Sequence, residues 1–244
     1  MELLRGPGGC PWDREQTHRS IRRNLLEEAY EAAEAIDQED PGHLREELGD
    51  VLLQVVFHAA MAREEGWFTL SDVVDGVCQK LVFRHPHVFG AVRAGDSSAA
   101  LDAWDAQKRR EKGQKSTGDA LDAVARSLPA LMRAEKIQDK ARKAGFDWSE
   151  AAQAADKLSE ECEELKTALR EGTHVEEELG DVLFAAVKAG RFAGLDSEQA
   201  LHAACEKFIR RFRAVERQAQ GQPLDRFPLE ELERMWDRAK EEKT

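Results

Sequence analysis

The chain has 244 residues, of which 48 are acidic and 36 are basic, giving a formal net charge of −12. This length suits one large domain or two of ordinary size, and either can bury a core. We expect no nucleic-acid or membrane partner, because phosphate backbones and anionic lipid surfaces attract basic patches. An anionic substrate would instead need a bridging metal ion.

The chain carries no sign of secretion or membrane insertion. Its start, MELLRGPGG, lacks the apolar stretch of a secretory signal, and no later apolar run approaches the roughly 20 residues of a membrane helix. The cysteines are scattered without a CxxC spacing, which favours free thiols over a zinc site or a disulfide framework. They are Cys10, Cys78, Cys162 and Cys205. We therefore expect a cytoplasmic protein.

Strand signals are scarce, whereas Ala, Glu, Leu, Lys and Arg recur at helical spacing, which predicts an all-α fold. In chain order, helices are expected over residues 15–37, 43–65, 71–83, 99–112, 120–143, 150–170, 174–193, 197–219 and 229–242. Residues 113–119 are polar and glycine-bearing without apolar periodicity, so they form the best linker candidate. We therefore divide the chain into residues 1–114 and 115–244.

The two halves repeat one another. The first contains LLEEAYEA (25–32), LREELGDVLLQVV (44–56) and KLVFR (80–84). The second contains LSEECEEL (158–165), VEEELGDVLFAAV (175–187) and KFIRR (207–211). Both therefore carry EExxE, ExLGDVL and KxxxR in the same order. This internal duplication predicts two tandem helical-bundle domains.

The repeated acidic residues form pairs spaced three apart, so each pair projects from one side of a helix. The pairs are Glu28 with Glu31, Glu47 with Asp50, Glu161 with Glu164, and Glu178 with Asp181. Asp50 and Asp181 lead into segments that are apolar nearly all round, which is typical of buried helices. A carboxylate at the mouth of a buried helix loses solvation unless it is paired or binds a cation.

Four converging carboxylates would repel one another, and a divalent cation is the simplest compensation. Mg²⁺ is favoured because the ligand set is all oxygen, and Mn²⁺ is the expected substitute. The alternative interpretation is a set of solvated, salt-bridged helix faces. Gly49 and Gly180, each just before the aspartate, cost a helix about 1 kcal/mol relative to Ala. We expect another helix or a ligand to approach the backbone closely there.

Basic and aromatic side chains follow the acidic motifs. Lys80 with Arg84, and Lys207 with Arg211, stand four apart on one helix face and could clamp phosphate oxygens. Their alternative role is the favourable placement of basic residues at helix C-termini. Trp236 shares an apolar face with neighbouring residues, so core packing competes with stacking on a nucleobase. No counterpart of Trp236 is recognised in the first half.

Several segments resemble the MazG family of nucleotide pyrophosphohydrolases. They are GCPWDREQT (9–17), RHPHVF (84–89), SLPALMRAEKIQ (127–138), GFDW (145–148) and EKFIRRFR (206–213). The resemblance implies the all-α NTP pyrophosphatase fold with tandem domains. It also implies a homodimer in which helices of two chains complete the bundles, and hydrolysis of nucleoside triphosphates to nucleoside monophosphates and pyrophosphate.

The resemblance also implies roles for individual residues. In the second half the magnesium ligands would be Glu161, Glu164, Glu178 and Asp181. Glu160 would lie near the attacking water, Lys207 and Arg211 would contact the triphosphate, and Trp236 would lie against the base. The first-half counterparts are Glu28, Glu31, Glu47, Asp50, Glu27, Lys80 and Arg84. Family members need not use both domains, and Trp236 favours the second half as the working one.

Two other functions are compatible with the sequence. One is a non-catalytic nucleotide-sensing helical scaffold that binds a protein partner. The other is a metal-dependent phosphohydrolase that cleaves a different bond and releases orthophosphate. The chain has no glycine-rich phosphate loop, so in each case metal and side chains rather than a backbone nest must hold the phosphates.

Overall fold

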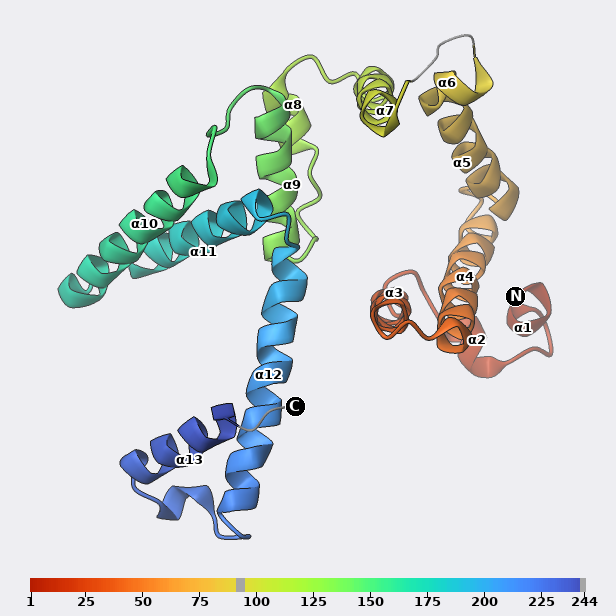
Figure 1. Cartoon of the computed structure of the whole chain (residues 1–244). Coiled ribbons are helices and arrows are strands. Elements are labelled where there is room, and N and C mark those ends of the chain that lie inside the picture. The colour runs from red at the N-terminus through yellow and green to blue at the C-terminus, as the bar shows by residue number, and fades with distance from the viewer. Residues whose placement is uncertain (91–94, 242–244) are drawn as a thin grey trace. The chain divides into compact units, whose positions relative to one another are not determined.

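The computed structural model describes residues 1–90 and 95–241, and it is built from helices (Figure 1). No strand occurs among these described residues, which confirms the predicted all-α fold. The helices fall into two compact units, Met1–Lys112 and Gly113–Thr244. The boundary thus lies two residues before the limit at 114 that the linker composition indicates.

The first unit contains seven helices in its described part. They are α1 (Glu2–Arg5), α2 (Pro11–Glu15), α3 (Arg22–Asp37), α4 (Pro41–Glu64), α5 (Leu70–Arg84), α6 (Pro86–Phe89) and α7 (Ser97–Glu111). Helices α3 and α4 pack along each other, and α7 packs against α5. A small core of Ile21, Phe57 and Met61 joins the residue before α3 to the second half of α4.

Helix α4 begins where the sequence supplies a cap. The Asp40 side chain accepts hydrogen bonds from the backbone N–H groups of Gly42 and His43 at 2.9 and 3.0 Å, and Pro41 occupies the first turn. These contacts satisfy donors that a helix start leaves unpaired. The cap therefore fixes where α4 begins, and with it the face on which Glu47 and Asp50 project.

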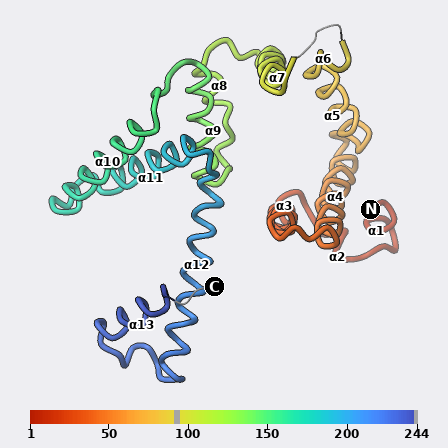
Figure 2. The backbone as a smooth tube through the Cα atoms, in the orientation of Figure 1, coloured from red at the N-terminus to blue at the C-terminus, as the bar shows by residue number. Residues whose placement is uncertain are grey.

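The second unit repeats this organisation. Its described elements are α8 (Thr117–Asp122), α9 (Ala130–Lys143), α10 (Ala151–Glu171), α11 (Val175–Phe192), α12 (Ser197–Gln218), the short 3₁₀ helix η1 (Leu224–Arg226) and α13 (Leu229–Glu241). Helices α10 and α11 run side by side (Figure 2), joined at Gly172, whose φ of 71° ends α10 in a left-handed turn. Helix α13 folds back on α12 around Val215 and Met235.

Two predicted helices differ from the structure. The single helix expected over 120–143 is split, because Pro129 lacks an N–H donor and pushes the residue before it out of the helical region. The helix expected from Glu15 begins at Arg22 instead. Thr17 and Ser20 hydrogen-bond to each other's backbone there, and such local bonds compete with a helix.

The two units expose more surface than compact proteins of their size. The accessible area of the chain is 17589 Å², whereas two separately folded units of the same total mass would expose about 13,000 Å². Large apolar side chains contribute to the excess. Among them are Leu48, Leu52, Leu179, Leu183, Phe208 and Phe212. No helix in the described part of the chain is long and apolar enough to cross a membrane.

Candidate functional site

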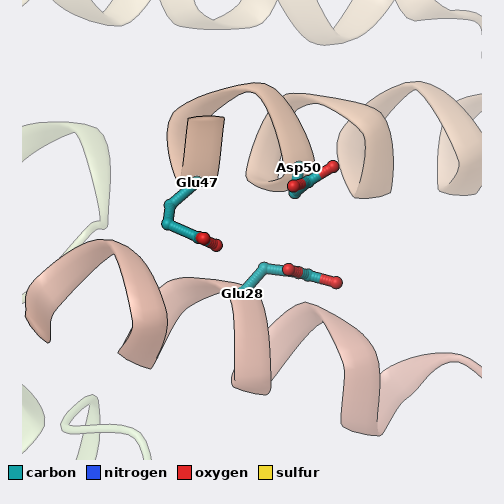
Figure 3. Close-up of side chains that lie close together, drawn as sticks. All are labelled: Glu28, Glu47 and Asp50. Atoms are coloured by element: carbon teal, nitrogen blue, oxygen red, sulfur yellow. The ribbon is translucent and has the colours of Figure 1, made fainter. Parts of the chain in front are cut away.

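Three carboxylates of the first unit meet between α3 and α4. Glu28 comes from α3, and Glu47 and Asp50 come from successive turns of α4 (Figure 3). One oxygen of each lies within 4.8 Å of the others. Glu47 is buried and the other two are half-buried. The pairing of the two helices thus creates the acidic cluster that the repeated motifs predict.

The electrostatics of this cluster favour a bound cation. Burial, followed by the charges of Asp50, Glu31 and Glu47, raises the pKa of Glu28. One Glu47 oxygen lies 3.0 Å from His43, but its Oε2 is buried without a hydrogen-bond partner among the described residues. Carboxylate oxygens arranged in this way could hold a divalent cation, which would relieve both the repulsion and the unpaired oxygen.

The second unit has an equivalent cluster. Glu161 and Glu164 of α10 and Glu178 of α11 each place an oxygen within 4.8 Å of the others. The hydrogen bond with Glu161, followed by burial, raises the pKa of Glu164. Lys157 lies 2.9 Å from Glu161 and 2.7 Å from Glu160. These two hydrogen bonds raise the lysine pKa, so Lys157 stays charged at neutral pH.

Four of the predicted acidic residues lie outside the two clusters. Glu31 and Asp181 are exposed, although each is three residues from a cluster member. A spacing of three leaves two side chains about 60° apart around the helix, so both members of a pair can still reach a cluster. Glu47 with Asp50, and Glu161 with Glu164, do so, which means that the spacing alone does not decide it. Glu27 and Glu160 are also exposed, and each pairs with a neighbouring cation, Arg23 or Lys157, at 2.7 Å.

The expected close approach at Gly49 and Gly180 is not made by another helix of the same chain. A Cβ built at either glycine would meet no atom within 4 Å in the part of the chain that the structure describes. The exposed Leu48 and Leu179 stand beside these glycines. This surface is open to a ligand or to a second chain.

The two KxxxR pairs differ in their surroundings. In the first unit, Arg84 lies 2.7 Å from Glu111 of α7, and its guanidinium carbon lies 5.2 Å from the centre of the Trp104 ring. Lys108 lies 4.7 Å from the same ring. Arg84 thus joins α5 to α7, whereas Lys80 is exposed. In the second unit, Lys207 and Arg211 lie on α12, beside the hairpin with α13.

A hollow of about 510 Å³ lies between α12 and α13. Its apolar lining includes Phe208, Phe212 and Trp236, and its polar lining includes Asp237 and Lys240. The Trp236 and Phe208 rings lie 5.0 Å apart, tilted by 46°. An apolar pocket of this size with a few polar groups is typical of a small-molecule site. Trp236 packs against the core cluster, as expected, and also lines the hollow.

Trp104 is a residue that the sequence interpretation overlooked. The sequence Trp-Asp-Ala-Gln-Lys at 104–108 matches Trp-Asp-Arg-Ala-Lys at 236–240. Both motifs lie on the helix that packs against the KxxxR helix of the same unit. Trp236 therefore has a counterpart in the first half. Extending the search for repeats beyond KxxxR would have found it.

Comparison with known proteins identifies both halves. The profile of the MazG nucleotide pyrophosphohydrolase domain matches residues 16–89 and 142–215. The nucleoside triphosphate pyrophosphohydrolase/pyrophosphatase MazG of Thermotoga maritima is 44% identical over 243 residues, covering 98% of this chain and 92% of that protein.

Two further relatives cover the chain to the same extent. The nucleoside triphosphate pyrophosphohydrolase of Escherichia coli K12 is 47% identical over 247 residues, covering 98% of this chain and 94% of that protein. The uncharacterized protein YabN of Bacillus subtilis is 45% identical over 243 residues, covering 98% of this chain and 50% of its own length.

Proposed function

The chain belongs to the MazG nucleotide pyrophosphohydrolase family, and on that premise we propose that it hydrolyses nucleoside triphosphates to nucleoside monophosphates and pyrophosphate. The observation that carries this proposal is the cluster of Glu161, Glu164 and Glu178 between α10 and α11. A net acidic protein can hold a triphosphate at such a cluster only through a cation. Clearing unwanted or excess triphosphates is the role that this activity suits.

We propose Mg²⁺ as the cation, with Mn²⁺ as a substitute. Its ligands would be the three clustered carboxylates together with Asp181, which lies one turn after Glu178. A bound magnesium ion neutralises triphosphate charge and lowers the pKa of a water molecule. Glu160 would accept a hydrogen bond from the attacking water and orient it toward the α-phosphorus.

The remaining residues would position the substrate. Lys207 and Arg211 would bind phosphate oxygens and stabilise the charge that develops on pyrophosphate as it leaves. Trp236 would stack on the base in the hollow between α12 and α13. The first unit would use an equivalent set. Its members are Glu27, Glu28, Glu31, Glu47, Asp50, Lys80 and Arg84.

The second unit is the better candidate for turnover. Trp236 lines an open hollow and has an aromatic neighbour. In the first unit, Trp104 instead has two cations near its ring, and Arg84 is paired with Glu111. A base would have to displace these contacts before it could stack on Trp104. The sequence favoured the second unit because no counterpart of Trp236 was recognised in the first. Trp104 is that counterpart, so the reason to favour the second unit is the different surroundings of the two tryptophans.

We also propose that the protein is a homodimer in the cytoplasm. The surface in excess of two separate compact units is about 4,000 Å² in each chain, whereas an obligate dimer buries about 1,000–2,500 Å² of each partner, so the excess is large enough to supply an interface. Exposed leucines beside the acidic clusters would become buried in such an interface. Four free cysteines fit a reducing compartment.

Product analysis separates this function from its two alternatives. Incubation with ATP and Mg²⁺, followed by phosphorus NMR, should give AMP and pyrophosphate, and excess EDTA should stop the reaction. In isotopically labelled water the label should enter AMP, because the attack is on the α-phosphorus. ADP and orthophosphate would instead identify a different phosphohydrolase. ATP binding without turnover would identify a nucleotide-sensing scaffold.

A further inference from the structure

The two acidic clusters differ at one buried position. Gln54 follows Asp50 by one helical turn on α4 and is 8% exposed. The corresponding residue in the second unit, in the aligned segments ELGDVLLQ and ELGDVLFA, is the buried Ala185. Because residues four apart share a helix face, Gln54 extends the line of Glu47 and Asp50.

The side chain of Gln54 is directed at the cluster. It lies close enough to Glu28 to lower the pKa of that carboxyl against the larger effect of burial, which places it beside the three acidic groups between α4 and α3. Its Oε1 is buried without a hydrogen-bond partner among the described residues, as is Oε2 of Glu47. An unpaired buried amide oxygen beside three carboxylates, one of which also has an unpaired buried oxygen, indicates a site that a cation or its water ligands would complete.

We infer that Gln54 is a positioning residue of a cation site formed by Glu28, Glu47 and Asp50, and that the two cation sites of the chain are unequal. This inference rests on the proposed cation-dependent function. Gln54 holds the Glu28 carboxylate toward the other ligands without adding charge. Rotation of the Gln54 amide by half a turn exchanges the positions of its nitrogen and its oxygen. The nitrogen would face Glu28 in the empty site, and the oxygen would face a cation or its water ligand in the filled site.

The second cluster is stabilised differently. Lys157 lies 2.9 Å from Glu161 and therefore places a positive charge on a carboxylate that the cation would use. In the first cluster, Gln54 places a neutral amide near Glu28 and the imidazole of His43 lies 3.0 Å from Glu47, whereas no lysine or arginine pairs with a cluster member among the described residues. A positive charge next to a ligand opposes cation binding, whereas a neutral donor does not. The first unit should consequently bind a divalent cation more tightly than the second in the absence of nucleotide.

Mn²⁺ titration of the full chain, followed by the electron paramagnetic resonance signal of free Mn²⁺, tests this inference. We expect two classes of site, the tighter one about tenfold or more stronger. Glu47→Gln should remove the tighter class and Glu178→Gln the weaker one, and these two residues occupy equivalent positions in the repeat. Loss of the tighter class in Glu178→Gln instead would overturn the assignment.

The role of Gln54 is then measured in the Glu178→Gln background, where the first site is isolated. Gln54→Met keeps the volume but removes both polar atoms, and it should weaken Mn²⁺ binding about tenfold. Gln54→Glu keeps an oxygen at the same place and should bind at least as tightly as its parent. In the Glu47→Gln background, Gln54→Met should leave the second site unchanged.

The possible results distinguish this inference from the function on which it rests. If Gln54→Met binds Mn²⁺ as its parent does, or if Met and Glu weaken binding equally, Gln54 has only a structural role. Circular dichroism melts identify any variant that fails to fold. If Gln54→Met does not fold, Mn²⁺ binding by Gln54→Glu decides the question. If the unaltered chain binds no Mn²⁺ at either cluster, the cation-dependent function itself is wrong.

Discussion

The guanidinium carbon of Arg84 lies 5.2 Å from the centre of the Trp104 ring, while the Nε of the same side chain pairs with Glu111 at 2.7 Å. Trp104 and Glu111 both belong to α7, so a single arginine from α5 holds the two helices together in two ways. The corresponding hairpin in the second unit is held by apolar packing around Met235 and Val215. The same repeated motif therefore joins two helices through an ion pair in the first unit, whereas aromatic side chains line the hollow beside it in the second. A hollow lined by Lys80 and Glu111 also lies beside the motif of the first unit.

Arg84→Ala should lower the free energy of unfolding of the first unit by about 1 kcal/mol, because a cation–π contact and a partly exposed ion pair are lost together. Arg211→Ala, at the equivalent position, should cost less than about 1 kcal/mol and should instead raise the KM for ATP. Urea denaturation and steady-state kinetics of both variants measure the contrast. Unchanged stability of Arg84→Ala would contradict the packing role.

Asp147 lies just before α10 and pairs with two basic side chains of α11. Its carboxylate lies 3.1 Å from Lys188 and 2.5 Å from Arg191, and all three side chains are largely buried. Asp147→Ala should cost about 3 kcal/mol of unfolding free energy, because two buried cations lose their counter-charge. Asp139→Ala, whose pairs with Arg142 and Lys143 are on the surface, should cost less than about 1 kcal/mol. Equal losses in denaturant melts would contradict this account.

The sequence predicted the helical fold and the paired motifs because both depend on local periodicity. Apolar spacing located the helices. Ordered recurrence grouped Glu28, Glu31, Glu47 and Asp50, and all of these except Glu31 lie in the cluster. The break at Pro129 was missed because apolar periodicity continues on both sides of it. The late start of α3 was missed because side-chain bonds around Thr17 and Ser20 overrode the helical pattern.

Other parts of the site depend on contacts between helices, which spacing does not reveal. The sequence shows that Glu31 and Asp181 each lie on the same side of a helix as a cluster member. It does not show which member of each pair reaches the space between the two packed helices. Gln54 resembles a surface residue until α3 packs over it. Trp104 was visible in the repeat, but the cations around it come from two helices. Pairwise helix packing, rather than local pattern, decides these cases.

Mg²⁺ should stabilise the protein more at neutral than at acidic pH. Burial and neighbouring carboxylates raise the pKa of Glu28. Its bound proton therefore stabilises the folded state, and this contribution is lost as the pH rises through the raised pKa. A cation takes over that role, so Mg²⁺ should raise the Tm by about 5 °C near pH 7.5 and much less near pH 4.5.

Differential scanning fluorimetry with Mg²⁺ or EDTA at both pH values measures this effect. Glu47→Gln together with Glu178→Gln is the control, because it removes one ligand from each cluster. An equal shift of the Tm by Mg²⁺ at both pH values would contradict cation binding at the two acidic clusters. An undiminished shift in the double variant would contradict it as well.

The exposed apolar face of α11 should lie in a dimer interface. Leu183 is 47% exposed and shares its helix face with Leu179, four residues earlier, which is also 47% exposed. Leu183→Arg should shift the mass measured by light scattering at micromolar concentration from dimer to monomer, with helix content retained. Glu163→Arg on the polar flank of α10 is the control and should stay dimeric. A monomeric mass for the unaltered chain would refute the homodimer.

The central claim is that the acidic cage of the second unit carries out triphosphate hydrolysis, and the turnover of two equivalent variants tests it most directly. Asp181→Asn and Asp50→Asn keep the shape of the side chain and remove one charge from the proposed ligand set of each unit. With ATP and Mg²⁺, we expect Asp181→Asn to lower kcat about a hundredfold or more and Asp50→Asn less than about tenfold. Inactivation by Asp50→Asn alone would assign catalysis to the first unit, and wild-type turnover in both variants would show that neither cage is the catalytic site.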